Sequence, residues 1–291
     1  MALDRIGLVI PPVGPWSTQQ RWYRWAEQVG YDVVYTYDHL THATAPGQWL
    51  SEAFTTLTAA AAVTERVKLG TLVASAVFRT AVTLARVAMT VQDISGGRLV
   101  LGLGMGAPTC ALADHGTQQR PSEMSARFAD VVRGYQAALD GATEWEGGTT
   151  SFRGLQTLPA PDGLVRPELL LAAHGPRALA LAAAHADTWN TYGGPGSTRL
   201  EPEEYWALLA RQALGFDEAC RTAGRDPLSV RRSLLLGFGE VRPATSADAF
   251  VAAAERAAAL GFTELVVYGP ESPAGMGSDP AVHEKALARL R

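Results

Sequence analysis

The chain has little cysteine and almost no lysine. Cys110 and Cys220 are its two cysteines among 291 residues, and they stand far apart. This spacing excludes a disulfide framework, a paired redox motif and a zinc knuckle, so we expect a reducing, cytoplasmic compartment and no metal site. Two lysines stand against 23 arginines and 49 alanines, a bias that a GC-rich genome explains better than protein physics does.

The sequence also lacks a long hydrophobic run and a strong charge imbalance. The uncharged residues 99–113 are too few, and too interrupted by glycine and proline, to cross a bilayer. Residues 1–10 include Asp4 and show no cleavage pattern, so we expect no signal peptide. A net charge of -4 and a pI of about 5.9 give no reason to bind nucleic acid or an anionic membrane. The expected partner is a small-molecule substrate.

Apolar runs of strand length alternate with segments of helical period along the whole chain. This alternation is typical of a βα-repeating, mostly parallel sheet. Strands are expected at residues 5–10, 33–37, 67–74, 99–103, 169–173, 187–190, 230–236 and 264–268. The sequence therefore predicts an α/β fold, a single TIM (β/α)8 barrel formed by one domain of residues 1–291. An open doubly wound sheet, in which strands and helices alternate along the chain in the same way, is the alternative.

Capping residues and breakers set the expected helix boundaries. Ser17 and Gln20 predict a capping box, and Gly30 a left-handed end to the same helix. Pro176 is expected to open a helix and Ser246 to cap one. Residues 142–161 are expected to insert a small hairpin-like excursion, and the stretch from the strand-four glycines to about position 121 to be irregular.

The glycines after the fourth strand match a dinucleotide pattern. Gly102, Gly104 and Gly106, followed by Ala107, satisfy G-x-G-x-x-[GA]. That fingerprint belongs to a first βα turn that opens directly into a helix, whereas this run follows the fourth strand and meets Pro108. A nicotinamide site is therefore disfavoured. The glycines either allow a tight turn or let the backbone pack against a flat ring.

Asp38 and His39 follow the second strand, at the edge where barrels carry catalytic residues. Histidine exchanges protons near neutral pH, and a neighbouring aspartate can orient it. A solvated loop pair is the alternative interpretation. Cys110 is assigned no chemistry, because a free cysteine is more often a small hydrophobic residue.

A second candidate site joins the fifth strand to its helix. Residues 172–177 read Ala-Ala-His-Gly-Pro-Arg. Free amides at a helix N-terminus attract anions, Gly175 leaves room for a phosphate to approach them, and Arg177 adds positive charge. An ordinary strand-to-helix turn is the alternative.

Four segments taken together resemble the bacterial luciferase-like superfamily of flavin- or coenzyme F420-dependent oxidoreductases. They are residues 67–73, residues 92–106 with the run Ser-Gly-Gly-Arg-Leu-Val-Leu-Gly-Leu-Gly, and residues 174–177 with 186–190. The similarity runs in order over most of the chain. It implies a TIM barrel with a tricyclic cofactor across the C-terminal strand ends, and we also expect a homodimer.

The resemblance assigns roles to individual residues. It implies that His39 is catalytic, facing the cofactor ring as proton donor or base. It implies that residues 72–75 form a bulged strand against the ring, with a strained peptide between Leu72 and Val73 for which the cis form is one option. The expected cofactor-binding residues are Asp38, His39, Leu72, Val73, Ala74, Ser75, Gly104, Gly106, Ala173, His174, Gly175, Pro176 and Arg177.

The chain departs from its resemblance at one position. F420-dependent sugar-phosphate dehydrogenases of this superfamily place a carboxylate directly after the strand-four glycines, where this chain has Ala107. His115 and Glu123 are candidates to replace that acid, and neither is chosen. Four aromatic residues are candidates for the walls of a substrate pocket, namely Trp16, Tyr37, Trp189 and Tyr192.

The expected function is hydride transfer between F420 and a small organic substrate. The GC-rich composition favours F420, which is common in actinobacteria. FMN with oxygen, in a monooxygenase, is the alternative. A flavin-binding protein without turnover comes next, and a nicotinamide dehydrogenase last.

Overall fold

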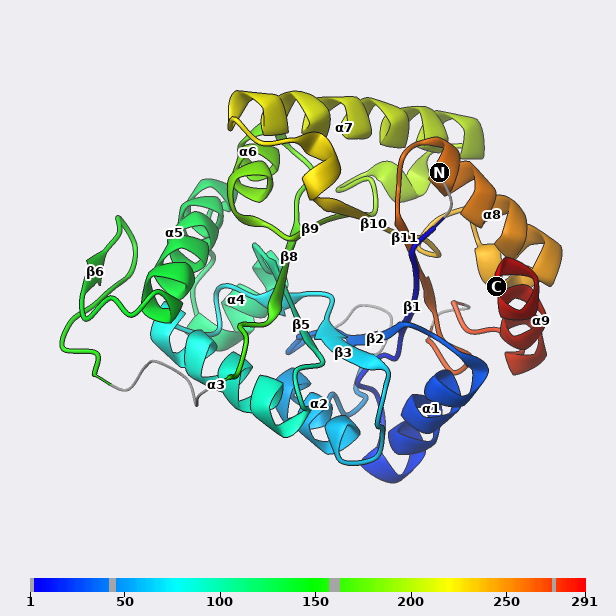
Figure 1. Cartoon of the computed structure of the whole chain (residues 1–291), viewed down its shortest axis with the longest axis horizontal. Coiled ribbons are helices and arrows are strands. Elements are labelled where there is room, and N and C mark those ends of the chain that lie inside the picture. The colour runs from blue at the N-terminus through cyan, green and yellow to red at the C-terminus, as the bar shows by residue number, and fades with distance from the viewer. Residues whose placement is uncertain (1–2, 42–45, 157–162, 274–275) are drawn as a thin grey trace.

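Eight parallel strands close into a ring in the computed structural model, which describes residues 3–41, 46–156, 163–273 and 276–291 (Figure 1). The ring contains, in order, β1 (Arg5–Val9), β2 (Val33–Thr36), β3 (Lys68–Thr71), β5 (Leu99–Gly104), β8 (Glu168–Ala172), β9 (Thr188–Thr191), β10 (Arg231–Leu235) and β11 (Glu264–Tyr268). Strand β11 pairs with β1, and a short β4 (Ala74–Ser75) continues β3 along β5. The predicted barrel is confirmed, and the open sheet is excluded because the ring has no edge.

Helices cover the outside of the ring (Figure 1). They are α1 (Trp16–Val29), α2 (Ala53–Ala61), α3 (Ala81–Ile94), α4 (Pro108–His115), α5 (Pro121–Leu139), α6 (Pro176–His185), α7 (Pro202–Thr222), α8 (Ala247–Ala259) and α9 (Pro280–Leu290). The described residues also form the short 3-10 turns η1 (Ser197–Arg199), η2 (Pro227–Ser229) and η3 (Pro243–Thr245). In the part of the chain that the structure describes, no helix combines the length and the apolar character needed to span a membrane.

Most helix boundaries follow the predicted caps, with two corrections. Gly30 ends α1 with φ 96°, and the Ser246 hydroxyl accepts a hydrogen bond from the Ala249 amide. The capping box at Ser17 is wrong, because α1 already starts after Pro15 and has no side-chain cap. The irregular stretch is also wrong in part, because α4 forms there. Its Pro108 is the first helical residue, where the fixed φ of proline favours a helix.

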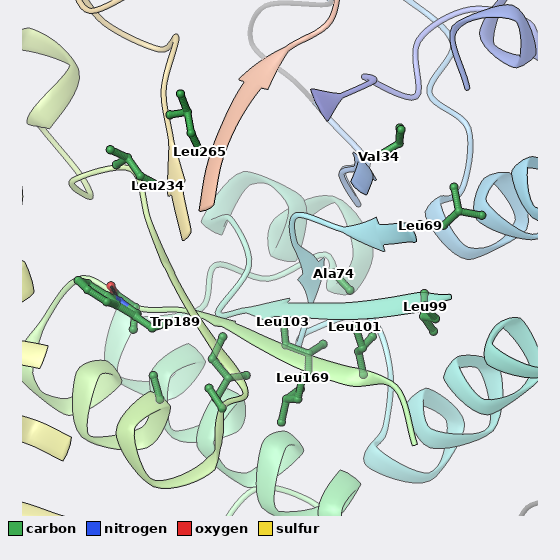
Figure 2. Close-up of a cluster of buried hydrophobic side chains, with 14 of the residues drawn as sticks. Val34, Leu69, Ala74, Leu99, Leu101, Leu103, Leu169, Trp189, Leu234 and Leu265 are labelled. Carbon is green, nitrogen blue, oxygen red and sulfur yellow. Dashed lines mark hydrogen bonds between the residues drawn. The ribbon is translucent and has the colours of Figure 1, made fainter. Parts of the chain in front are cut away.

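Side chains on the outer face of the strands pack against the helices. Leu99, Leu101 and Leu103 lie on one side of β5, as Figure 2 shows. Trp189 is fully buried, and its ring stacks on Phe216 of α7 with centroids 4.4 Å apart. Trp189 therefore belongs to the layer between barrel and helices, and its candidacy as a pocket wall is wrong. One face of α7, which includes Trp206, Leu209 and Phe216, is buried there as well.

The N-terminal end of the barrel interior is closed by an ionic cluster. Arg5 donates two hydrogen bonds to the Glu168 carboxylate, at 2.9 and 3.0 Å, and one to Glu264 at 3.2 Å. The Tyr35 hydroxyl donates to Glu264 at 2.9 Å, and its ring lies where a Cβ on Gly70 would otherwise be. A closed end here leaves the C-terminal end of the barrel as the place for a site.

The most specific run of the resemblance has a structural role. The Arg98 guanidinium donates to the carbonyl oxygens of Ala61, Thr64, Val67 and Ser95, at 2.6 to 3.1 Å. Two of these carbonyls lie at or just beyond the C-terminal end of α2, where helical partners are missing. Arg98 therefore ties α2, β3 and the end of α3 together.

The predicted excursion is present as a hairpin of β6 (Trp145–Glu146) and β7 (Ser151–Phe152). Asp130 of α5 holds it by accepting hydrogen bonds from the Thr149 amide and hydroxyl, at 2.6 and 2.8 Å. The predicted excursion extends to position 161, and its last part, residues 157–161, lies outside the described residues.

The described chain ends lie near each other, beside the start of β1 and the segment before β2. Leu3, Asp4, Leu290 and Arg291 line one hollow of about 420 Å³. The Arg291 guanidinium also donates to the Gly30 carbonyl. Both ends are thus on the face opposite the C-terminal strand ends.

Candidate functional site

The predicted site residues follow four strands that are neighbours in the ring. They come after β2, along β4, at the end of β5 and after β8. Because all strands are parallel, these segments meet at the same rim. The structure therefore brings the predicted candidates onto one side of the barrel mouth.

His39 lies partly exposed at this rim and contacts Cys110 of α4. Its Nδ1 is 3.4 Å from the Cys110 Sγ, and its ring stands edge-on to Tyr37 with centroids 5.1 Å apart. Cys110 is 1% exposed, and its Sγ donates to the Thr41 carbonyl at 3.5 Å. Sequence reasoning missed this contact, because the two residues are 71 positions apart.

Asp38 is buried, and its carboxylate binds residues other than its neighbour His39. Its carboxylate accepts hydrogen bonds from Arg79 at 2.6 Å and from the Ser75 amide at 3.1 Å. Arg79 also pairs with Glu52, the N-cap of α2, and lies 4.7 Å above the Phe54 ring. Asp38 therefore fixes strand β4 and the segment after it.

The predicted bulge of the third strand lies between β3 and β4. The peptide between Leu72 and Val73 is cis, and it separates β3 from β4. Val73 is partly exposed above the apolar cluster that fills the top of the barrel interior. Ser75 is buried, and its hydroxyl has no hydrogen-bond partner among the described residues. A buried, unpartnered hydroxyl here is one that a bound group can satisfy.

The glycines in and after β5, the fourth of the predicted strands, make room for other atoms of the protein. A Cβ on Gly102 would collide with the Thr71 carbonyl oxygen. A Cβ on Gly104 would lie 2.5 Å from Val73, and Gly106 has φ 89° and lies against the Ser75 hydroxyl. The space that these glycines leave is thus filled by the strand-three bulge, so they position that bulge at the rim.

The N-terminus of α6 is open. Gly175 is the N-cap, Pro176 is the first helical residue, and no side chain caps the helix. Nothing lies within 4 Å of a Cβ placed on Gly175. The first-turn amides of Arg177 and Ala178 therefore face open space, which fits an anionic group such as a phosphate. Arg177 is exposed and also lines the groove between α5 and α6.

His174 is half-buried, next to buried Ala173, and is held by neighbours. Its Nδ1 lies 3.0 Å from the Thr191 hydroxyl, and its ring stands edge-on to Tyr192 with centroids 4.6 Å apart. Burial lowers the pKa of His174 to about 4, so the ring is neutral at pH 7. It adds no positive charge to the anion site.

Sequence reasoning missed the glycine-rich loop after β9. Gly193, Gly194 and Gly196 have φ between 85° and 92°, and a Cβ on Gly194 would meet His174. Gln212 of α7 accepts from Thr191 at 2.8 Å and donates to the Gly193 carbonyl at 2.9 Å. The loop thus lies against the segment before α6. The run Gly-Gly-Pro-Gly was the available signal.

Neither candidate replacement for the acid at Ala107 joins His39 in this structure. His115 lies 3.2 Å from the Val77 carbonyl and 3.6 Å from Asp114. Glu123 is exposed and completes a capping box with Arg120 at the start of α5. Among the residues that the structure describes, no three or more His, Cys, Asp or Glu side chains form a metal-binding group.

Aromatic side chains surround the mouth. Tyr37 and Tyr268 belong to the apolar cluster at the top of the barrel interior, with Tyr192 packed against it. Phe238 contacts Tyr192 and Tyr268, with ring centroids 5.2 Å apart in each pair. A cavity of about 280 Å³ opens beside Tyr268, between the segments after β10 and β11, and Arg242 lines it. Of the predicted wall residues, Trp16 instead packs on Tyr23.

Known proteins match this arrangement. The profile of the luciferase-like monooxygenase family matches residues 5–238. A protein of Mycobacterium tuberculosis named as a coenzyme F420-dependent oxidoreductase is 31% identical over 175 residues, which are 56% of this chain and 48% of that protein. This chain thus spans about half the length of that relative. A 5,10-methylenetetrahydromethanopterin reductase of Methanolobus tindarius is 26% identical over 94% of this chain and 76% of its own.

A solved structure shows the same fold. An F420-dependent secondary alcohol dehydrogenase in complex with an F420-acetone adduct superposes with a TM-score of 0.83 at 16% identity, covering 100% of this chain and 98% of the other. The chain belongs to the luciferase-like monooxygenase family, since the family profile covers most of its length. The predicted superfamily is confirmed.

Proposed function

We propose that this chain is an oxidoreductase that binds coenzyme F420 across the C-terminal rim and transfers hydride between it and a small organic substrate. Bound F420 supplies a two-electron carrier. His39 exchanges the accompanying proton, and the open N-terminus of α6 holds the cofactor phosphate. The aromatic mouth excludes water and contacts the apolar part of the substrate.

One observation carries the proposal, namely the shared rim of His39, the Leu72–Val73 bulge and the α6 N-terminus. An apolar floor, an unpartnered Ser75 hydroxyl and an uncapped helix start fit a flat ring that carries a phosphate. The names of the Mycobacterium tuberculosis relative and of the solved structure support F420 in particular.

The residue after the strand-four glycines supports a narrower substrate range. Ala107 has no acid group, and neither His115 nor Glu123 contacts His39 among the described interactions. We therefore propose a substrate other than a sugar phosphate. Enones, imines and quinones are suitable test compounds, because each is reduced by the net addition of a hydride and a proton.

The decisive experiment is a titration of the purified protein with F420 and with FMN under anaerobic conditions. We expect the dissociation constant for F420 to be lower than that for FMN. Turnover is then followed as loss of reduced cofactor across the panel of test compounds. Oxidation of F420H2 that depends on one of these compounds supports the proposal.

FMN-dependent monooxygenation is the alternative, and the family description supports it. Tighter binding of FMN, with substrate-dependent consumption of oxygen, would replace the F420 proposal. Tight binding of either cofactor without turnover would indicate a binding protein.

Location and assembly are further proposals. Cys110 and Cys220 are free and buried, which supports a reducing compartment, and we propose the cytoplasm. We propose a homodimer on the resemblance alone. Light scattering that gives a mass near 30.9 kDa, that of one chain, would contradict it.

A further inference from the structure

Cys110 and His39 form a thiol–imidazole pair at the barrel mouth. The Sγ lies 3.4 Å from Nδ1, which is hydrogen-bonding distance for sulfur. The pair joins helix α4 to the segment after β2, and Thr41 completes it, with its carbonyl and its hydroxyl at 3.5 and 3.8 Å from the sulfur. Cys110 is also the third residue of α4, near the positive end of that helix.

This environment differs from that of a core cysteine. Burial raises the pKa of the Cys110 thiol, but hydrogen bonds from His39 and from the backbone around Thr41 lower it further, to about 7. Cys220 of α7 provides the contrast, because burial raises the pKa of its thiol. The pKa values of the two thiols are thus shifted in opposite directions.

We propose that Cys110 is the positioning residue of His39: it holds Nδ1, so that protons pass to and from the substrate through Nε2. The proposal rests on the proposed function, in which His39 exchanges the proton. It supplies a partner for His39 in a chain that has Ala107 after the strand-four glycines. With 1% exposure, Cys110 acts through the imidazole and not as a surface nucleophile.

The proton balance is simple. In the ionised form of the pair, Sγ carries a negative charge and both ring nitrogens carry a proton. When a substrate oxygen takes a proton, the N–H bond at Nε2 breaks and an O–H bond forms. The ring is then neutral, with its remaining proton on Nδ1 towards the sulfur. A proton from solvent restores the pair, and the opposite reaction direction reverses each step.

Among the residues that the structure describes, other titratable and charged groups near the pair come from the segments after β2 and β4 and from α4. Tyr37 packs edge-on against His39 at the end of β2. The Asp38–Arg79 ion pair lies on the same rim, with both side chains largely buried. Asp114 and His115, which contact each other, lie further along α4. His39 is the group whose charge acts on Cys110.

The first test needs no cofactor. Thiolate absorbance at about 240 nm is recorded against pH for the whole protein. We expect one thiolate to appear with a midpoint near pH 7, as the pKa of Cys110 indicates. Cys110→Ser should abolish this step, His39→Gln should move it upward by about one unit or more, and Cys220→Ala should keep it. A wild-type protein without this step, or an unchanged midpoint in His39→Gln, would overturn the pair.

The second test uses the holoenzyme with an accepted substrate. We expect Cys110→Ala to lower kcat about tenfold to a hundredfold and to change the pH dependence of kcat, with the cofactor dissociation constant within about twofold of wild type. Cys110→Ser keeps a hydrogen-bonding group that does not ionise in this range, so it should recover part of kcat but not the wild-type pH profile. Cys220→Ala is the matched control and should change neither.

Two results separate the proposals. An unchanged pH profile in Cys110→Ala would overturn the positioning role. A protein that binds neither F420 nor FMN would overturn the proposed function, while the thiolate titration would still report on the pair.

Discussion

Gly175 stands at the N-cap of α6 with φ -102° and ψ 166°, a backbone conformation that any residue adopts. A side chain there meets no protein atom within 4 Å, so Gly175→Val should fold. It should obstruct the approach of a phosphate to the helix amides. We expect a loss of about 1 to 3 kcal/mol in cofactor binding, the range for charge-assisted hydrogen bonds, measured by titration.

The matched control for this change is Gly148→Val in the hairpin. Gly148 is exposed, and the nearest atom to an added Cβ is Asp130 Oδ2 at 3.7 Å. The control should keep both stability and cofactor affinity. Unchanged affinity in folded Gly175→Val would remove the phosphate from the α6 N-terminus.

Replacing His39 can distinguish a role in proton transfer from a role in cofactor binding. If its imidazole exchanges the proton, His39→Ala should lower turnover by about 10²- to 10⁴-fold, with a much smaller change in the cofactor dissociation constant. Rapid-mixing measurements at saturating cofactor give the two quantities separately. Weak binding combined with full turnover at saturation would show that His39 only positions the ring.

Sequence patterns predicted which residues lie at the rim, but they did not predict which side chains these residues contact. His39 was predicted from its place after a strand and Gly175 from its place at a helix N-terminus, and the convergence of strand ends in a parallel barrel puts both on one rim. The Cys110–His39 contact depends on where α4 packs, and no local spacing encodes it. The same holds for Asp38, whose partner is Arg79 on another segment.

At the scale of elements, Arg98 joins two helices and a strand by hydrogen bonds to four carbonyl groups. Lysine keeps the charge but cannot reproduce the planar fork of donors. We expect Arg98→Lys to lower the free energy of unfolding by roughly 2 to 4 kcal/mol, because buried carbonyls lose their partners. Urea denaturation of this variant measures the loss.

Arg211→Lys, at an exposed position of α7, is the control and should change stability little. The folded Arg98→Lys protein should bind cofactor as the wild type does. A variant of full stability would show that the Ser-Gly-Gly-Arg run serves another purpose.

The elements themselves follow the sequence closely, and the two exceptions have one cause. Strand β11 and helix α6 have the predicted bounds, because strong caps or long apolar runs define them. Helix α4 was missed because Pro108 was interpreted as a breaker, although proline also favours a first helical turn. At Ser17 the cause is again a proline, since Pro15 is the N-cap and the helix begins at Trp16, before the predicted cap.

For the whole molecule, the ionic cluster at the closed end of the barrel predicts an acid response. Burial raises the pKa of Glu168, but hydrogen bonds and charge from Arg5 outweigh it and lower the pKa from 4.5 to about 2. The folded pKa is depressed, so the stabilisation is complete above pH 4.5 and is lost as pH falls toward 2. The loss should be on the order of 3 kcal/mol.

Urea unfolding of wild type and Glu168→Gln over this pH range checks the assignment. The variant should be less stable at neutral pH, because Arg5 loses one of its two carboxylate partners, and its stability should depend less on pH below 4.5. Burial raises the pKa of Glu264, which acts in the opposite direction, and the variant lacks the Glu168 charge that adds to this rise. The exposed Glu146→Gln is the control, and an equal acid slope in all three proteins would contradict the role of Glu168.

The described chain ends lie near each other on the face away from the rim. The strands can therefore follow one another in a different order along the chain while keeping their places in the barrel. A short peptide bridging Leu3 and Arg291, with a new opening between Gly147 and Gly148, would give a circular permutant. Its ring would keep the same neighbours, because no strand is cut. Such a chain would begin and end in the hairpin loop between β6 and β7, and a fluorescent reporter attached there would leave the barrel mouth uncovered.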